Sequence, residues 1–516
     1  MTKMMMRTKG LVTRVVLLCA AAVAAVVVAR ALTARSLQMH PEACKKTDLD
    51  YLEATEERIE TLRAMIQQRS ISFRQRHGNA TGHARVREVL QERFPLIHHQ
   101  DSPVQREVLA EYSLLYRFPG KDESLKPALL CGHIDVVPIA NPDAWEHEPF
   151  DAGIHDGYIY GRGALDDKTR VTAMMEAVEF LLASKGFDYR PQRTLLFAFG
   201  HDEEVNGVEG ASVISAELVR RGWYPEFLLD EGLPIYTDVL GIDRPVALIG
   251  TSEKGYLTVR VQVHMDHDGA GHSSRPPKEQ AVAILSRALT RLHENPHPAH
   301  INGALFDMIT HLAPEMPFLK RIIMCNLWLF APIAKLFVSL KSDSDALQRT
   351  TTALTVIEGG VKENVLPHTV SALVNHRISP GETVADVVAR DITIIADARV
   401  SVEIVHSVEP LPTSSCETRG FKVLERSIRQ IWPDYYVAPA LMIAGTDTKH
   451  YVNLTPNLYR FMPVVMGPTD TPRLHGPNER ISVDAYEKVL NFYIHLLHNI
   501  DTFNPHDVHH HELGDL

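Results

Sequence analysis

The chain has 516 residues, of which 45% are hydrophobic and 23% charged, and its formal net charge at pH 7 is −11. This is the composition of a globular protein, and the length is too great for one compact core, so we expect two or more domains. With 53 basic against 64 acidic side chains, the chain lacks the basic surface that phosphate neutralisation requires, which excludes nucleic acid as an expected partner.

A basic and then apolar segment opens the chain. The uncharged run Val15–Ala29 follows four Lys and Arg residues, and Arg30 comes directly after it. This pattern predicts a signal peptide over residues 1–34, with small-residue cleavage positions around Ala29–Ala34. The run is shorter than the roughly 20 residues of a membrane span, and an uncleaved signal anchor is the alternative. Either reading predicts a secreted or luminal protein.

The five cysteines are widely scattered and lack the CxxC spacing of a structural zinc site. Cys131 lies inside an apolar run, so we interpret it as a small buried side chain rather than a disulfide partner. Asn79 and Asn453 each begin an Asn-X-Thr sequon, which fits a glycoprotein of the secretory pathway.

Residues 45–252 are predicted to form the first part of a catalytic domain. A charged helix is expected within 45–78, and the clearest helices cover 171–185 and 211–221. Strand-like runs alternate with these helices from about residue 105 onwards. Such alternation predicts a mostly parallel sheet that helices cover on both faces.

After Gly250 the pattern changes to that of a second domain. The expected elements are a strand at 255–265, a helix at 278–293, strands at 351–358 and 369–377, a helix at 382–396 and a strand at 400–405. This β-α-β-β-α-β order is that of a ferredoxin-like sandwich. We therefore expect a lid domain at 253–407, inserted into a catalytic domain that resumes at 408–505. A solvated, His-rich tail at 506–516 follows.

The lid carries an apolar excursion at 299–345. Its segment 322–340 is a poor transmembrane helix, because Pro332 and Lys335 interrupt it in mid-span. We interpret the segment as a pair of short amphipathic helices packed on the lid. The alternative is that part of this apolar surface receives an apolar substrate tail.

Three short apolar runs within about a hundred residues each end in metal-binding residue types. They are PALLCGHIDVVP, TLLFAFGHDEE and PEFLLDEG. These ends supply His133 and Asp135, Glu203 and Glu204, and Asp230. A buried parallel strand delivers such groups at its carboxyl end, where open α/β sheets build their sites. The joint placement predicts a metallohydrolase.

Two further segments complete the candidate site. Asp166 lies in the Gly-flanked turn GRGALDDK and offers two oxygens that could bridge a pair of cations, and His475 lies in LHGPNER. His133 and Asp135 are two residues apart, so both side chains point to the same face of a strand. Asp135 can therefore accept the second ring N–H of a metal-bound His133.

The motifs HIDVVP, GRGALDDK, HDEE and LHGPNE resemble those of the aminoacylase/carboxypeptidase S family of co-catalytic zinc peptidases, over residues from about 50 to 500. The resemblance implies an α/β fold: a zinc-exopeptidase-like, mostly parallel sheet domain with an inserted ferredoxin-like lid. It also implies two Zn²⁺ per subunit and five metal ligands. One zinc would be held by His133, Asp166 and Asp230, and the other by Asp166, Glu204 and His475.

The resemblance assigns further roles, residue by residue. Asp135 would orient His133, and Glu203 would be the general base. His272, in the lid motif GHSSRPP, would stabilise the oxyanion, often from a partner subunit. Residues implied to bind substrate are Asn364, Arg377 and Gly445. For Arg377, which suits a substrate carboxylate, the alternative is a surface ion pair.

The resemblance implies a dizinc amidohydrolase that cleaves, and in reverse forms, N-fatty-acyl amino acids. Its small-molecule partner would be an N-acyl amino acid, or a fatty acid plus an amino acid. One alternative is a carboxypeptidase or dipeptidase that uses the same site. The other is a non-catalytic receptor, which the seven intact motif positions disfavour. A homodimer through the lid and contact with a lipid or lipoprotein surface are further expectations.

Overall fold

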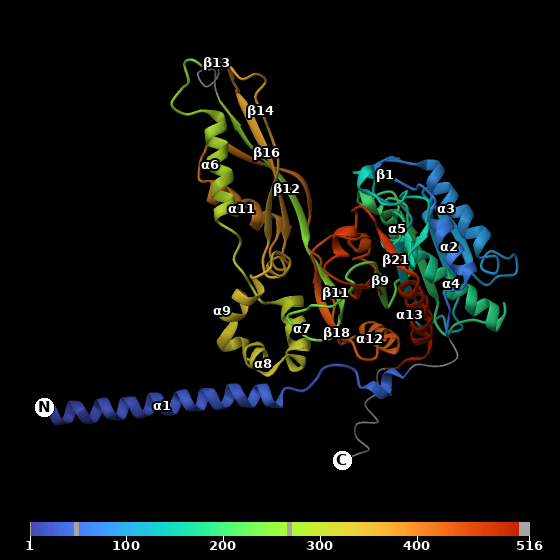
Figure 1. Ribbon diagram of the computed structural model, residues 1–516, viewed down its shortest axis with the longest axis horizontal. Helices are drawn as coiled ribbons and strands as arrows, with labels where there is room; N and C mark the ends of the chain where they lie inside the picture. Colours follow the sequence, from blue (N-terminus) through green and yellow to red (C-terminus); the bar gives the residue numbers. More distant parts are fainter. Residues whose placement is uncertain (1, 46–50, 266–270, 505–516) are drawn as a thin grey trace.

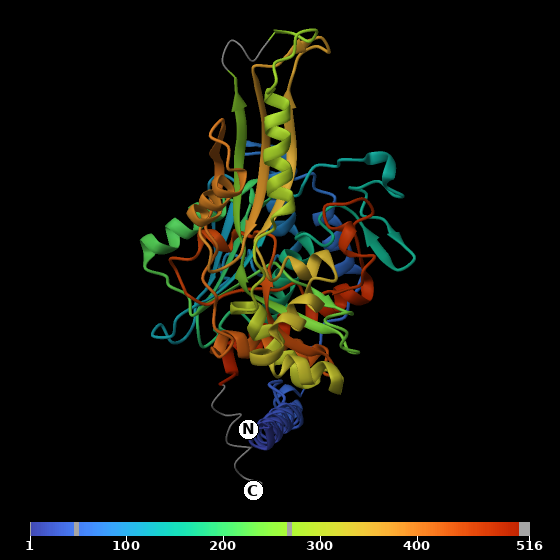
Figure 2. The same ribbon diagram turned by 90° about the vertical axis from the view of Figure 1, so that its left-hand side faces the viewer.

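The computed structural model describes residues 2–45, 51–265 and 271–504. It consists of a sheet domain, an elongated lid that rises beside it, and a long N-terminal helix, α1 (Thr2–Thr33), that projects away from both (Figures 1 and 2). The predicted His-rich tail at 506–516 lies outside the described residues.

Within the described residues, ten strands from both halves of the chain form one central sheet. Its order is β20-β10-β11-β19-β9-β5-β8-β4-β3, with β18 beside β11. The strands are β3 (Gln105–Leu109), β4 (Ser113–Phe118), β5 (Ala128–His133), β8 (Leu195–Gly200), β9 (Phe227–Asp230), β10 (Ile235–Tyr236), β11 (Val246–Glu253), β18 (Tyr436–Met442), β19 (Leu458–Arg460) and β20 (Val465–Met466). The pairs β5–β8, β5–β9 and β9–β19 are parallel, whereas β3, β4 and β8 pair antiparallel at one edge.

Helices cover both faces of the central sheet, because successive side chains of a buried strand point to opposite faces. On β5, Leu130 packs into the core beneath one helical layer, whereas Leu129 and Cys131 pack against α5 (Ala211–Arg221) on the other face. The first layer consists of α2 (Glu56–Ile66), α3 (Ala80–Arg93), α4 (Lys168–Lys185), α12 (Arg419–Ile431) and α13 (Val483–Thr502). The predicted α/β fold is confirmed, and so is the interpretation of Cys131, whose thiol is free and buried.

The lid is a four-stranded antiparallel sheet with two helices on one face. Its elements are β12 (Gly255–His264), α6 (Ala281–Glu294), β14 (Thr351–Gly359), β16 (Thr369–Ile378), α11 (Val384–Ile395) and β17 (Val400–Val408). The strand order β14-β16-β12-β17 is that of the predicted ferredoxin-like sandwich. Alternate residues of β12, from Leu257 to Val263, are buried beneath α6 and α11, as the period-two pattern predicts.

The apolar excursion forms four short helices: α7 (Gly303–Leu312), α8 (Phe318–Met324), α9 (Leu327–Val338) and α10 (Ser342–Asp345). The predicted pair of short helices is confirmed as α8 and α9. Their predicted packing on the lid is wrong, because Met324 and Ala334 are buried against β11 and β18 of the central sheet, in a cluster that includes Leu248 and Ala438. The excursion thus covers apolar sheet surface at the edge of the sheet domain.

α1 is one continuous helix that runs through Arg30. Its segment Val12–Thr33 has 22 residues and a mean hydropathy of 2.6, and is long and apolar enough to cross a membrane. This segment is longer than the uncharged run Val15–Ala29 that the sequence shows. It can include Arg30, because a charged side chain near the end of a membrane span can reach the interface. A signal sequence has the same features, so cleavage and anchoring both stay predictions.

The remaining short strands of the described residues form three small sheets. They are β1 (Ser72–Arg74) with β2 (His77–Gly78), β6 (Ile154–His155) and β7 (Tyr158–Tyr160) with β21 (Arg480–Ser482), and β13 (Gly271–His272) with β15 (Val365–Leu366).

Candidate metal centre

The candidate site lies where three neighbouring parallel strands end. β5 ends at His133, the single turn Glu203–Val205 follows β8, and Glu231 follows β9. Because β5 is hydrogen-bonded to both β8 and β9, their carboxyl ends meet at one edge of the sheet. This edge gathers imidazole and carboxylate groups from segments almost a hundred residues apart.

Asp166 lies between two imidazoles. Its Oδ1 is 2.8 Å from Nε2 of His133, and its Oδ2 is 3.1 Å from Nε2 of His475. The same His475 nitrogen lies 3.2 Å from Oε2 of Glu204. The two oxygens of one carboxylate thus face two separate nitrogen ligands, which is the disposition that a metal-bridging carboxylate requires.

Asp135 contacts both His133 and the turn that carries Glu203 and Glu204. Its Oδ1 lies 3.3 Å from Nδ1 of His133, the ring nitrogen that points away from Asp166. The same carboxylate accepts hydrogen bonds from the backbone N–H groups of Glu203 (3.1 Å) and Glu204 (3.2 Å). Burial raises the pKa of Asp135, but contacts with His133, Ser72 and His83 together lower it by more, so the net pKa is below its ordinary value. A charged Asp135 orients the imidazole and positions the two glutamates.

At the end of β9, the structure brings Glu231 rather than Asp230 to His133. Oε2 of Glu231 lies 3.6 Å from Nε2 of His133, and His133, Glu203 and Glu231 each place one ligand atom within 4.8 Å of the others. Asp230 instead accepts a hydrogen bond from the backbone N–H of Glu231 (2.9 Å). Consecutive residues at a strand end point to opposite sides, so only one of the pair can face the site.

Two buried residues that the motif analysis did not single out support the site. Glu479 accepts hydrogen bonds from the backbone N–H groups of Gly163, Leu165 and Asp166, at 2.8–3.1 Å. Arg162 donates to Glu479 (2.6 Å) and to the backbone carbonyl of His475 (3.0 Å). The pair therefore joins the turn that carries Asp166 to the loop that carries His475. The sequence signal was present, since both residues lie within the motifs GRGALDDK and LHGPNER.

The buried negative charge of the site favours the binding of cations. Burial lowers the pKa of His133, but Glu231, Asp135 and Asp166 together raise it well above its ordinary value. Contacts with Asp166 and Glu204 raise the pKa of His475 to about 10. Imidazoles are thus held against an excess of buried carboxylates, which is costly unless positive charge compensates it.

The donor set fits divalent metal ions. Oε1 of Glu204 is buried and has no hydrogen-bond partner among the described residues, as expected of an oxygen that binds a metal ion. Two imidazole nitrogens with carboxylate oxygens are ligands that Zn²⁺ accepts well.

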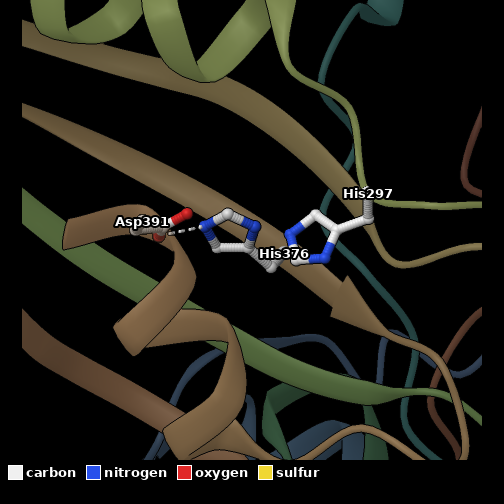
Figure 3. Close-up of side chains that lie close together, drawn as sticks. All are labelled: His297, His376 and Asp391. Atoms are coloured by element: carbon white, nitrogen blue, oxygen red, sulfur yellow. Dashed lines mark ion pairs between the residues drawn. The ribbon is translucent and has the colours of Figure 1, made fainter. Parts of the chain in front are cut away.

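A second His- and Asp-containing cluster lies in the lid. Nε2 of His376 is 3.0 Å from Oδ2 of Asp391, and His297 lies nearby; all three residues are buried. Figure 3 shows His376 between the other two, with one ring nitrogen facing Asp391 and the other facing His297. Its Nδ1 also contacts the hydroxyl of Thr352 (3.1 Å). One ligand atom of each of the three residues lies within 4.8 Å of the others. Because the two ring nitrogens of His376 already contact Asp391 and Thr352, we interpret the cluster as a buried polar network of the lid core.

The structure brings His272 and Asn364 together at the tip of the lid. His272, on β13, pairs with Val365 on β15, and the backbone carbonyl of Asn364 accepts a hydrogen bond from the N–H of Ser273 (3.1 Å). Figure 1 shows β13 at the end of the lid that lies far from β9, the strand that ends at Asp230. The exposed His272 therefore does not reach the metal centre of its own chain.

Arg377 and Gly445 lie near the passage from the sheet domain to the lid. Arg377 pairs with Tyr256 on β12, and its guanidinium carbon is 4.8 Å from the centre of the Tyr256 ring. A Cβ at Gly445 would lie 3.6 Å from Oε1 of Glu253, so the loop passes close to the end of β11. Burial, and then the charge of Arg377, lower the pKa of Lys254 to about 8.

Comparison with known proteins identifies the family. Residues 129–499 match Peptidase family M20/M25/M40. The chain belongs to this family. The prediction from the motifs is thereby confirmed.

Among M20 relatives, the chain is 42% identical over 449 residues to the N-fatty-acyl-amino acid synthase/hydrolase PM20D1 of Xenopus tropicalis, covering 86% of each protein. It is 43% identical over 422 residues to the probable carboxypeptidase S-like 2 of Dictyostelium discoideum, covering 81% of this chain and 79% of that protein.

The crystal structure of an M20 family metallo-carboxypeptidase from Sulfolobus solfataricus shares the fold, with a TM-score of 0.59 at 17% identity, covering 86% of this chain and 99% of that one. The M20 chain is therefore a metal-dependent enzyme that hydrolyses amide bonds.

Proposed function

We propose that this M20 enzyme hydrolyses N-fatty-acyl amino acids with two Zn²⁺ per subunit, and that it catalyses the reverse condensation of a fatty acid with an amino acid. The observation that carries the two-metal proposal is the position of Asp166 between His133 and His475. The substrate class rests on the similarity to the Xenopus synthase/hydrolase over 86% of both chains.

The metal ligands proposed from the geometry differ in one residue from those that the sequence predicts. One zinc would be held by His133, Asp166 and Glu231, and the other by Asp166, Glu204 and His475. Glu231 replaces Asp230 in the proposed ligand set because Oε2 of Glu231 faces Nε2 of His133, whereas Oδ1 of Asp230 accepts the backbone N–H of Glu231. When bound, such a pair of ions polarises the scissile carbonyl and lowers the pKa of water.

Glu203 is proposed to move the proton. Its carboxylate lies in the same group as His133 and Glu231, and its backbone is fixed by Asp135. In hydrolysis, Glu203 takes a proton from the attacking water as the new C–O bond forms. It then gives that proton to the amine nitrogen as the C–N bond breaks, which releases the amino acid and the fatty acid.

The lid is proposed to bind the rest of the substrate. Arg377, which stacks on Tyr256, can pair with the carboxylate of the amino acid through two parallel N–H groups. Asn364 and Gly445 are proposed to line the same substrate site. His272 is proposed to donate to the oxyanion of a second subunit, which is supported by its exposed place at the lid tip. The homodimer through the lid remains part of this proposal.

The decisive test is Glu203→Gln, assayed on an N-fatty-acyl amino acid with the metal content measured in the same preparation. The variant should retain zinc and lose activity by a factor of about 10² or more, because the general base is gone. Glu209→Gln, which removes a carboxylate paired with the exposed Arg76, is the matched control and should keep full turnover. Full turnover by Glu203→Gln would refute the mechanism.

A second candidate is a carboxypeptidase with the same site, which the similarity to the carboxypeptidase S-like protein of Dictyostelium favours. A panel of substrates with one amino acid and either fatty-acyl chains of increasing length or blocked peptides separates the two. Higher kcat/KM for long acyl chains supports the first function, and preference for peptides supports the second.

The chain is proposed to act in the secretory pathway or outside the cell, since α1 has the features of a signal peptide or an anchor.

A further inference from the structure

In the hairpin of α8 and α9, large apolar side chains face outward, the reverse of the usual arrangement in a surface helix. Five large apolar side chains on α9 and one just after its end are 41–71% exposed, whereas the small Ala334 is buried against the sheet domain. The exposed residues are Trp328, Leu329, Ile333, Leu336, Phe337 and Leu340. A helix at a water-exposed surface normally turns its apolar stripe inward and its polar face outward. A contiguous outward apolar face of this size marks an interaction surface.

α8 extends the same surface around a sharp bend. The axes of α8 and α9 are 114° apart, and Leu319 on α8 is 77% exposed. From Phe318 to Leu340 the chain contains no acidic residue, and its charged residues are Lys320, Arg321 and Lys335. The hairpin is therefore apolar on its outer face and positively charged overall.

The membrane-length helix α1 lies directly beside this hairpin. The side chain of Asn326, between α8 and α9, donates to the backbone carbonyl of Val27 (3.1 Å), and Arg30 donates to the carbonyl of Cys325 (3.3 Å). Figures 1 and 2 both show α8 next to the C-terminal part of α1, while the N-terminal part of α1 projects away from the sheet domain and the lid. Val27 and Ala31 are buried by this contact, whereas Val15, Leu18 and Val26 are 50–70% exposed.

These positions set the hairpin at the level where α1 would leave a bilayer. Val27 belongs to the apolar segment Val12–Thr33, and Arg30 is the first charge after the uncharged run. An arginine at that point suits the headgroup layer. The turn that contacts Val27 and Arg30 must then lie at the boundary between hydrocarbon and headgroups, with α8 and α9 in the interface.

We propose that α8 and α9 form a docking surface for a lipid bilayer, and that α1 remains attached as the anchor that holds this surface on the membrane. The outer side chains of α9 enter the boundary between headgroups and acyl chains, as those of interfacial amphipathic helices do. Lys335 can reach the anionic lipid headgroups, and Lys320 and Arg321, which donate to the backbone carbonyls of Leu240 and Met316, add positive charge to the same hairpin. The occupant is thus a lipid surface, with anionic lipid favoured over neutral lipid.

The test uses the full chain reconstituted into vesicles of phosphatidylcholine with one fifth phosphatidylserine, made with and without bromine-labelled acyl chains. Bromine quenches tryptophan only at close range, and Trp328 stands on the outer face of α9. The difference between the wild type and Trp328→Phe isolates its signal among the four tryptophans. We expect Trp328 emission to be quenched in brominated vesicles, and less so when phosphatidylserine is left out.

The paired variant is Leu336→Asp with Leu340→Asp. Both side chains are largely exposed, at 67% and 71%, so the thermal midpoint of unfolding should stay at the wild-type value. The docked fraction should fall by at least about tenfold for each leucine, because burying one contributes a factor of about ten or more. Quenching should therefore disappear while α1 still anchors the chain.

Two results would overturn the proposal. One is an unquenched Trp328 in the reconstituted wild type, above all if light scattering in detergent shows a dimer that the double aspartate variant abolishes, since a second copy would then be the occupant. The other is a mature chain, isolated from producing cells, that has lost residues 1–34 and fails to float with the same vesicles. No substrate is present in these measurements, so their outcome is independent of the proposed amidase activity.

Discussion

Nη1 of Arg162 donates a hydrogen bond of 2.6 Å to Oε2 of Glu479, and both side chains are almost completely buried. The other oxygen of Glu479 receives three backbone N–H groups from the turn that ends at Asp166. Because Arg162 also holds the backbone of His475, one ion pair sets the distance between the carboxylate of Asp166 and the imidazole of His475. The metal centre thus depends on a pair of residues that contact no proposed metal.

The first prediction follows from this pair. Glu479→Gln keeps the size of the side chain but leaves the buried Arg162 without its counter-charge. Zinc affinity, measured by competition with a chromogenic chelator, should fall by about 10- to 100-fold, as is typical when a residue that orients ligands is lost. Glu358→Gln, at an exposed lid position near Arg260, is the control and should bind zinc as the wild type does. Unchanged zinc affinity in Glu479→Gln would contradict the positioning role.

The second prediction separates Glu231 from Asp230. Glu231→Gln should lose one of the two zinc ions and nearly all activity, because its carboxylate faces Nε2 of His133. Asp230→Asn retains an oxygen that can accept the N–H of Glu231, so it should keep both ions and a larger share of activity. Metal analysis by mass spectrometry beside kcat measurements checks both variants. If Asp230→Asn lost a zinc ion and most activity while Glu231→Gln kept both ions, Asp230 and not Glu231 would be the ligand.

The third prediction concerns Glu176, which lies on α4 and pairs with Arg58 at 3.2 Å. Burial raises the pKa of Glu176 to about 7, although the charge of Arg58 opposes this. An unfolded Glu releases its proton near its ordinary value, about 4.3, so between that pH and about 7 the folded state binds more protons. The free energy of unfolding should therefore fall as pH rises through this window, by up to about 3 kcal/mol.

Glu176→Gln should flatten that dependence. Denaturant unfolding of both proteins at pH 5 and pH 7 measures it: the wild type should lose more stability than the variant between these two values. Equal pH dependence of the two proteins would show that Glu176 is ionised in the folded state.

The fourth prediction concerns the lid network. Asp391→Asn weakens the contact with His376 inside the lid core, so the free energy of unfolding should fall by about 1–3 kcal/mol. The zinc content should not change, because both ring nitrogens of His376 are engaged by Asp391 and Thr352 within the network (Figure 3). Thermal unfolding and metal analysis of one preparation give both readouts. A loss of one metal ion per subunit would identify the cluster as a metal site.

The local sequence pattern predicts many of the helices and strands of this protein and the location of its candidate metal site. The period-two run at 255–265 and the helical runs at 171–185 and 211–221 correspond closely to β12, α4 and α5, because burial on one face imposes the period of each element on the sequence. The motifs around His133 and Asp166 likewise indicated a metal site, since strand ends carry site residues in this class of fold.

Only the tertiary structure shows which of two adjacent residues faces the site and which surface an apolar helix covers. Asp230 and Glu231 are adjacent and chemically alike, and only the direction of the chain after β9 brings Glu231 to His133. The apolar pattern of α8 and α9 predicts two helices, but which neighbour they cover depends on the sheet surface near β11 and β18. The sequence indicates which runs are buried and which segments can supply metal ligands. Their partners come from distant parts of the chain, and only the folded arrangement selects among them.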